Sequence, residues 1–281
     1  MQLKCSHYSG CGNDFLIFDD RQEWFPQGTN GEQLIRTLCD QAAVDGCILL
    51  RTAEIAHFQM QFYNRDGTSA AMCGNGVRAF MRYLIEKQGW NQENCSIQIN
   101  QRLLHVETVG TDIRVEMGNI IELGWNIPLE YEGKVWQLHH LNSGVPHLVI
   151  FVDDLESIDI AKIGAFFRYH PKFQPDGANV NFVDKQNYKI RTFERGVEAE
   201  TLACGTGVTA SAIALHKIEK IEFPIRLQVR SLQFLEIDCQ NGKITMTGPA
   251  NFVRDGFINF DQVTLQSSLH FHLNVSQYNP V

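Results

Sequence analysis

The feature that most constrains the fold of this 281-residue chain is a short stretch that it contains twice. The stretch CGNGV at residues 73–77 returns as CGTGV at residues 204–208. In each copy a cysteine and two glycines follow a β-rich segment and precede an apolar run with helical periodicity, at residues 78–86 and 209–218. Each copy therefore predicts a strand, a turn and the N-terminus of a helix.

The two copies belong to a longer duplication. At an offset of 134 residues Ser9 and Gly10 match Ser143 and Gly144, and at an offset of 131 the two cysteine stretches coincide. A period of this length indicates two similar domains rather than a solenoid. We expect an α+β fold in which each domain wraps short, mostly antiparallel strands on one apolar helix. The expected domains are residues 1–118, joined by the C-terminal segment 262–281, and residues 119–261.

Composition excludes several classes of protein. The formal net charge is −8 and no block of lysines and arginines occurs, so nucleic acid is not an expected partner. The chain has no signal-peptide pattern and no run of 18 apolar residues, which predicts a cytoplasmic protein that is not embedded in a membrane. The eight cysteines form no C-x-x-C pair, so neither a zinc site nor a disulfide framework is expected.

Two cysteines at two matched helix N-termini suggest a reaction. The unpaired N–H groups and partial positive charge of a helix N-terminus stabilise a thiolate or a carboxylate. Two such thiols can address opposite faces of one carbon, one removing a proton and the other returning it. This chemistry inverts a centre next to a carboxylate without a cofactor. The alternative is that both cysteines only pack.

Seven motifs together resemble one family, the diaminopimelate epimerases. They are GCGNDF (10–15), YNRDG (63–67), CGNGVR (73–78), GVPH (144–147), NVNF (179–182), ERG (194–196) and ETLACGTG (200–207). The resemblance implies cofactor-independent interconversion of LL- and meso-2,6-diaminopimelate in lysine and peptidoglycan biosynthesis. It also implies two pseudosymmetric domains, each a strand barrel around a central helix, and a homodimer.

The resemblance also assigns site residues. Cys73 and Cys204 become the acid/base pair, with His147 supporting Cys73 and Glu194 supporting Cys204. The residues that would bind the substrate are Asn13, Asn64, Gly74, Asn75, Asn179, Glu194, Arg195, Gly205 and Thr206. No metal is implied. An arginine fork suits the distal carboxylate of such a substrate, and the backbone N–H groups of the two glycine loops suit the reacting carboxylate.

Some positions depart from the family pattern. Val145 replaces a substrate-binding asparagine, and the segment at residues 41–45 is shortened. Ser69 stands where the family often has an acidic residue, and Arg254 replaces a tyrosine of the family's dimer contact. Because these changes fall outside the thiol loops, we expect retained chemistry with relaxed recognition of the distal end, extending to racemisation of glutamate.

Other functions remain open at this point. A proline or hydroxyproline racemase would carry histidine where Asn75 stands, and a phenazine-type isomerase would lack the cysteine pair. A non-catalytic module could use the two helix N-termini only to bind anions. A thiol redox protein is a further alternative.

Overall fold

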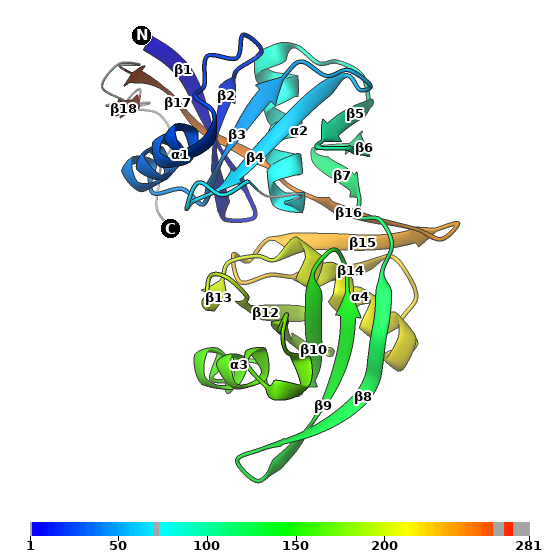
Figure 1. Cartoon of the computed structure of the whole chain (residues 1–281). Helices are drawn as coiled ribbons and strands as arrows, with labels where there is room; N and C mark the ends of the chain where they lie inside the picture. Colours follow the sequence, from blue (N-terminus) through cyan, green and yellow to red (C-terminus); the bar gives the residue numbers. More distant parts are fainter. Residues whose placement is uncertain (1, 70–72, 261–266, 272–281) are drawn as a thin grey trace. The chain divides into compact units, whose positions relative to one another are not determined.

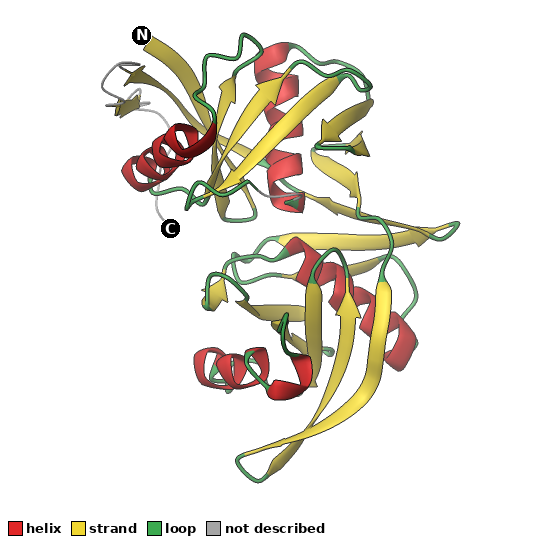
Figure 2. Ribbon diagram, in the orientation of Figure 1, coloured by secondary structure: helices red, strands yellow, loops and turns green. Residues whose placement is uncertain are grey.

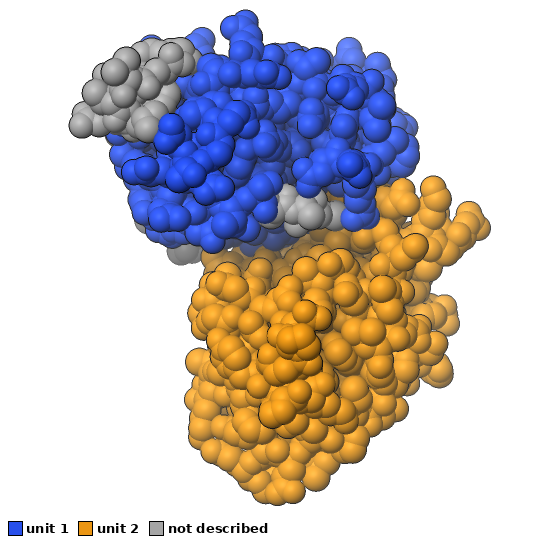
Figure 3. All heavy atoms as spheres, viewed as in Figure 1, with its two compact units in different colours: residues 1–108, 250–281 blue, residues 109–249 orange. Residues whose placement is uncertain are grey.

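The computed structural model describes residues 2–69, 73–260 and 267–271. The chain forms two compact units, shown in separate colours in Figure 3. Unit 1 comprises Met1–Thr108 and Ala250–Val281, and unit 2 comprises Val109–Pro249. Along the described part of the chain, no helix combines the length and the apolar character needed to cross a membrane.

Unit 1 contains helices α1 (Gly28–Ala42) and α2 (Gly74–Gln88). Its strands are β1 (Gln2–Gly10), β2 (Asn13–Asp19), β3 (Gly46–Arg51), β4 (Phe58–Asn64), β5 (Asn94–Ile99), β6 (Arg102–Val109), β17 (Asn251–Phe260) and β18 (Ser267–Phe271) (Figure 1). They pair in the order β18-β17-β1-β2-β3-β4-β5-β6. The pairs β2–β3 and β4–β5 are parallel, and the others are antiparallel.

Unit 2 contains helices α3 (Ile160–Arg168) and α4 (Gly205–Glu219) and a 3-10 turn, η1 (Pro171–Phe173). Its strands are β7 (Asp112–Glu116), β8 (Ile121–Tyr131), β9 (Lys134–Asn142), β10 (Pro146–Val152), β11 (Asn179–Asp184), β12 (Lys189–Glu194), β13 (Ala199–Thr201), β14 (Ile225–Gln228), β15 (Phe234–Gln240) and β16 (Lys243–Gly248). They pair in the order β8-β9-β10-β11-β12-β14-β15-β16-β7, and β13 pairs with the end of β12.

The two units repeat one topology. The run β17-β1-β2-β3-β4-β5-β6 of unit 1 matches β8-β9-β10-β11-β12-β14-β15 of unit 2, with the same sequence of parallel and antiparallel pairs. Helices α1 and α3 each link the first parallel pair, and α2 and α4 each lie in the link of the second. The predicted α+β class and the predicted pseudosymmetry are therefore confirmed.

One long helix packs against the strands of each unit (Figure 2). Helix α2 contacts β1, β2, β4 and β17, and α4 contacts β9, β10, β11, β14 and β15. Both helices begin immediately after the cysteine, as the sequence predicts, and α2 ends at Gly89, whose positive φ of 71° forms a left-handed C-cap. The buried faces of both helices are largely apolar, and their burial stabilises both units.

The junctions between the units differ in place from those expected from the sequence. β7 lies before the expected boundary near Gly118, yet it pairs with β16 and so belongs to unit 2. β17 lies before residue 262, yet it pairs with β1 and so belongs to unit 1. Both partners are distant in sequence, so local patterns carry no sign of them. Of the C-terminal segment 262–281, only β18 lies within the described residues, and it pairs with β17.

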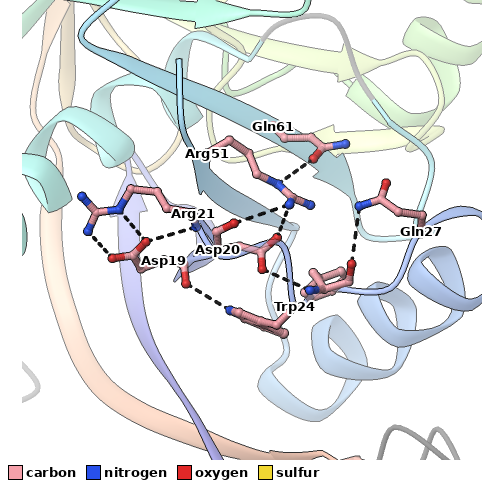
Figure 4. Close-up of polar contacts among 8 residues, drawn as sticks. Asp19, Asp20, Arg21, Trp24, Gln27, Arg51 and Gln61 are labelled. Carbon is pink, nitrogen blue, oxygen red and sulfur yellow. Dashed lines mark hydrogen bonds and ion pairs between the residues drawn. The ribbon is translucent and has the colours of Figure 1, made fainter. Parts of the chain in front are cut away.

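A buried ion pair closes the end of β2 (Figure 4). Arg51 Nη1 lies 2.6 Å from Asp20 Oδ2, and the Asp20 side chain is fully buried. The N–H of Phe25 donates to the other Asp20 oxygen, and Arg51 Nε donates to Gln61. Burial raises the pKa of Asp20 although the charge of Arg51 opposes the rise. The pair fixes the loop that carries the chain from β2 towards α1.

Candidate active site

Both cysteines of the repeated stretch occupy the N-cap position of their helix. Cys73 has φ −140° and ψ 108°, and Cys204 has φ −121° and ψ 104°, so both residues are extended before the helix starts. The carbonyl of each accepts the first intrahelical hydrogen bond, from Val77 and from Val208, at 2.9 Å. The N–H groups ahead of these bonds lie at the helix start, and in unit 1 that of Gly76 donates to Cys73 Sγ.

The remaining cysteines illustrate what ordinary burial does to a thiol. Burial raises the pKa of Cys5 and of Cys95 to about 12, and it raises that of Cys47 well above its usual range. These thiols remain protonated near neutrality and are poor nucleophiles and bases. Cys73, by contrast, is partly exposed at its helix N-terminus.

In unit 1 the sulfur of Cys73 faces hydrogen-bond donors. The N–H of Gly76 donates to Cys73 Sγ at 3.4 Å, and Asn13 Nδ2 donates at a longer 3.9 Å. Asn13 Oδ1 is buried and has no hydrogen-bond partner among the described residues. A buried acceptor of this kind is suited to a donor on a ligand, such as an ammonium group.

The other expected residues of unit 1 lie around the same loop or support it. Asn75 is buried, and its Oδ1 accepts from Arg78 at 2.7 Å. Asn64 ends β4, and its Nδ2 donates to the Thr68 hydroxyl in the turn that follows. Gly10 brings the β1–β2 hairpin close to the loop, because a Cβ there would lie 2.6 Å from the Asn75 carbonyl oxygen.

In unit 2 a buried amide fixes the protonation of His147. Asn181 Oδ1 accepts from the Thr192 hydroxyl at 3.0 Å, so its Nδ2 is the atom that faces His147. Nδ2 donates to the Leu148 carbonyl at 3.0 Å and to His147 Nδ1 at 3.1 Å. Burial and the charge of Arg195 lower the pKa of His147 to about 3. His147 is thus neutral near pH 7, and this hydrogen-bond network assigns its proton to Nε2.

The hydrogen bonds continue from His147 to Cys204. His147 Nε2 lies 2.9 Å from Thr206 Oγ1, and Thr206 Oγ1 lies 3.5 Å from Cys204 Sγ. With the proton on His147 Nε2, the imidazole donates to Thr206, whose own hydroxyl is then free to donate to the sulfur. His147 therefore supports the Cys204 loop of its own unit. The support of Cys73 by His147 remains a prediction.

Glu194 and Arg195 lie together at the end of β12. Glu194 Oε2 accepts from the Thr201 hydroxyl at 2.8 Å, and Arg195 Nη1 donates to the Asp176 carbonyl at 3.0 Å. Asn179 holds the backbone here, because its Oδ1 accepts from the Arg195 N–H at 2.8 Å and its Nδ2 donates to the Pro146 carbonyl. The amide of Asn179 is thus occupied within the protein, while the Arg195 guanidinium is half-buried at the surface.

The segment with the unusual valine borders the Cys204 loop. Ser143 donates its hydroxyl to the Thr206 carbonyl at 2.8 Å, and Gly144 turns the chain with a φ of 111°. The half-buried Val145 follows directly. Gly207 closes the loop against Asn181, because a Cβ on Gly207 would lie 2.2 Å from Asn181 Oδ1. Val145 is therefore next to a loop in which the expected substrate contacts lie.

Sequence reasoning assigned no role to three residues that organise these loops, namely Arg78, Asn181 and Ser143. Asn181 carried a usable signal, since it is a polar residue at a core-facing position between apolar strand residues. Arg78 carried another, as a charge inside an apolar helical run. Among the described residues no cluster of three or more His, Cys, Asp or Glu side chains could hold a metal ion.

Comparisons of structure show a shared fold. The structure of a phenazine biosynthesis protein of the PhzF family from Bacillus anthracis matches with a TM-score of 0.72 at 13% identity, covering 92% of this chain and 100% of that chain. A hydroxyproline epimerase from Agrobacterium vitis matches with a TM-score of 0.70 at 12% identity, covering 94% of each chain. At these identities the similarity extends to the fold alone.

Comparisons of sequence are more specific. The family model described as diaminopimelate epimerase matches residues 5–122 and 140–253. The diaminopimelate epimerase of Hydrogenobaculum sp. is 35% identical over 274 residues, covering 90% of this chain and 98% of the relative. That of Archaeoglobus fulgidus is 31% identical over 281 residues, covering 94% and 99%. The chain therefore belongs to the diaminopimelate epimerase family of isomerases, as its ordered motifs predicted.

Proposed function

We propose that this enzyme interconverts LL- and meso-2,6-diaminopimelate by proton transfer at the α-carbon, with Cys73 and Cys204 as the two acid/base groups. The observation that carries the proposal is that each unit presents a cysteine as the N-cap of its central helix, in the same backbone conformation. Family membership supports the choice of substrate, because relatives along nearly their whole length are named diaminopimelate epimerase.

The proposed reaction needs no cofactor. One thiolate takes the α-hydrogen as a proton, the electron pair passes into the adjacent carboxylate as an enediolate, and the other thiol gives its proton to the opposite face. The N–H groups at a helix start can hold the carboxylate and its growing charge. After one turnover the thiol and the thiolate have exchanged places, so the reverse reaction starts from the other cysteine. Because the proposed substrate is diaminopimelate, we propose that the enzyme acts in lysine and peptidoglycan biosynthesis.

Other residues have proposed roles around this chemistry. Asn13 Oδ1, buried and without a partner among the described residues, would accept from the substrate ammonium group. Glu194 and Arg195 would bind the distal amino and carboxylate groups, because a carboxylate pairs with ammonium and a guanidinium fork with carboxylate. Asn64 and Asn179 would also bind the substrate, and Gly74, Asn75, Gly205 and Thr206 would bind the reacting carboxylate through their N–H groups.

Deuterium incorporation tests the reaction directly. LL-diaminopimelate incubated with enzyme in D2O, without any added cofactor, should become meso-diaminopimelate carrying deuterium at the inverted α-carbon. Mass spectrometry and chiral chromatography measure both changes. Substrate recovered without deuterium or inversion would instead favour an anion-binding module. A redox protein would be indicated by turnover of a disulfide partner with no exchange.

A second proposal concerns substrate range, and Val145 is the observation that favours it. Because valine cannot provide the polar contact of the family's asparagine, we propose that the enzyme also racemises L-glutamate, a shorter acidic amino acid. The ratio of kcat/KM for LL-diaminopimelate to that for L-glutamate measures selectivity. Val145→Asn should raise this ratio, with Val145→Ala as the control that changes size without adding an amide. Strict selectivity in the wild type would refute relaxed specificity.

A further inference from the structure

Arg168 is a largely buried arginine at the last position of α3, and its side chain is 13% exposed. The helix packs closely on β12, because a Cβ on Gly164 would lie 2.5 Å from Phe193 Cβ. Phe193 directly precedes Glu194 and Arg195, the pair proposed to bind the distal end of the substrate. The close packing therefore fixes α3 against the strand that carries this pair.

Arg168 holds the turn that follows Arg195. Its Nη2 donates to Glu198 Oε1 at 3.1 Å, and the same oxygen accepts from the Gly196 N–H at 2.9 Å. The Glu198 N–H donates to the Glu194 carbonyl at 2.8 Å, which closes the turn around Arg195. The Glu198 carboxylate therefore links the end of α3 to the backbone next to Arg195.

Arg168 also contacts the loop that holds the Arg195 guanidinium. A Cβ on Gly177 would lie 2.0 Å from Arg168 Nη1 and 2.9 Å from the Arg168 carbonyl oxygen, so this loop packs directly on Arg168. Asp176 comes immediately before Gly177, and its carbonyl accepts from Arg195 Nη1 at 3.0 Å. A guanidinium has five N–H donors, so one such bond can orient the group while other donors bind a carboxylate. Arg168 thus contacts both segments that fix Arg195.

The backbone at Glu198 indicates that its side chain has a role. Glu198 has a φ of 57°, in the left-handed region that favours glycine. At the offset of 131 residues that aligns the two cysteine stretches, it corresponds to Gly67, which has a φ of 88°. Glycine would therefore suit this backbone better than glutamate does.

The contacts of Glu198 also stabilise its charge. Partial burial opposes ionisation, yet the Gly196 N–H and the charge of Arg168 hold the pKa of Glu198 below its usual range. Glu198 and Arg168 therefore form an ion pair at neutral pH.

We propose that Arg168 and Glu198 are positioning residues that hold Arg195 in the orientation in which it binds the distal carboxylate of the substrate. They act through the turn and the loop that fix Arg195, not through contact with the substrate. The proposal rests on the proposed function and adds how the enzyme selects a substrate that carries this carboxylate.

Chemical modification of Arg195 tests the positioning without using the reaction. Phenylglyoxal, which reacts with guanidinium groups, is applied to the wild type and to Glu198→Gly in the absence of substrate, and peptide mass spectrometry measures the rate at Arg195. Glycine suits the backbone of the turn, so this variant removes the carboxylate without adding strain. Arg195 released from its loop should react about threefold faster or more, because it is open to the reagent for more of the time. An unchanged rate would overturn the proposal.

Further variants test whether the ion pair is the cause. Arg168→Met should also raise the rate at Arg195, and adding Glu198→Gly to it should raise the rate no further, because the two residues act through one bond. Fully additive effects would contradict this coupling. Lys162→Met is the matched control, because it breaks the ion pair of Lys162 with Glu132 on the same helix. It should leave the rate at Arg195 unchanged.

Kinetics test the role in substrate selection. Glu198→Gly should raise KM for LL-diaminopimelate about tenfold and change kcat by less than about twofold, because the weakened contact is made before and during the reaction. Glu198→Gln, which keeps an acceptor for Gly196 and Arg168, should recover most of this loss. L-Lysine equals diaminopimelate without the distal carboxylate, so its inhibition constant should stay unchanged. A similar rise for both ligands, or a fall in kcat alone, would overturn the role in selection.

These measurements separate the positioning from the proposed function. If the wild type does not epimerise LL-diaminopimelate, the proposed function and the role in selecting that substrate both fail, whereas the modification rate still decides whether Arg195 is positioned. If the wild type epimerises and Glu198→Gly keeps the wild-type KM and modification rate, only the positioning is rejected. Should Arg168→Met fail to fold, Glu198→Gly and Glu198→Gln still decide.

Discussion

The two cysteine loops share a backbone and differ in the side chains behind it. In both, an extended cysteine caps a buried helix and two glycines follow the cap. In unit 1 the buried guanidinium of Arg78 lies behind the loop. In unit 2 a series of hydrogen-bonded side chains, Asn181, His147 and Thr206, lies there instead. Both units thus present a cysteine in the same backbone conformation, with different side chains behind each loop.

The largest effect expected is from removing either thiol. Cys73→Ala and Cys204→Ala should each lower kcat for epimerisation by about 10³-fold, since general acid–base groups contribute about 10²–10⁴-fold. If both act on one carbon, either loss should reduce inversion of the substrate by a similar factor. Chiral chromatography of the product measures it, and Cys239→Ala, outside both loops, is the matched control. Normal epimerisation by either loop variant would contradict the two-base assignment.

A smaller effect concerns His147 and acid stability. The folded pKa of about 3 lies below the unfolded value of about 6.5, so the unfolded state binds the proton first as pH falls. The stability that the neutral imidazole contributes is complete above pH 6.5 and is lost progressively towards pH 3. Between pH 7 and pH 4 this amounts to about 3 kcal/mol.

Urea denaturation of wild type and His147→Gln at both pH values measures this difference. The variant should lose less stability on acidification, because glutamine does not titrate. His105→Gln, which removes an exposed histidine, is the control for the loss of an imidazole. A variant curve parallel to that of the wild type would show that His147 takes up its proton as readily in the folded enzyme as in the unfolded chain.

Matched glycines probe the packing behind each loop. A Cβ at Gly207 would lie 2.2 Å from Asn181 Oδ1, whereas at Gly76 the nearest atom, Met60 Cε, would be 3.4 Å away. Gly207→Ala should therefore cost about 1–3 kcal/mol of stability and disturb the bond from Asn181 to His147. Gly76→Ala should cost less than about 1 kcal/mol. Thermal unfolding of the two variants measures the difference. Equal losses of stability would mean that the Asn181 side chain can move away from the added Cβ.

The sequence predicted the repeated part of this structure well. The glycines and cysteines lie close together in sequence and act through backbone geometry, so the helix starts at residues 74 and 205 follow from local pattern. The order of motifs also identified the family, and the comparisons confirm it. Local pattern sufficed wherever one residue's role depends on its immediate neighbours.

What the sequence did not predict depends on contacts between distant residues. Because β7 pairs with β16 and β17 pairs with β1, the chain passes between the units at other residues than the sequence predicted. The hydrogen bond from Asn181 to His147 spans 34 residues. Helix α3 was also not predicted. The burial of Arg78 depends on the β1–β2 hairpin, whose Cys11 lies 67 residues away in sequence. No periodicity within a single segment encodes such contacts.

The smallest effect expected is from the Thr206 hydroxyl, which has no equivalent at Asn75 of unit 1. Thr206→Val keeps the shape of the side chain but leaves His147 Nε2–H without its acceptor, which should cost about 1–2 kcal/mol of stability. It also removes the hydroxyl beside Cys204 Sγ, so kcat should fall by about threefold to tenfold. Thr206→Ser keeps the hydroxyl and should restore both. If Thr206→Ser is impaired as much as Thr206→Val, the hydroxyl alone does not support the Cys204 loop, and the hydrogen bonds from His147 through Thr206 do not explain the loss of activity.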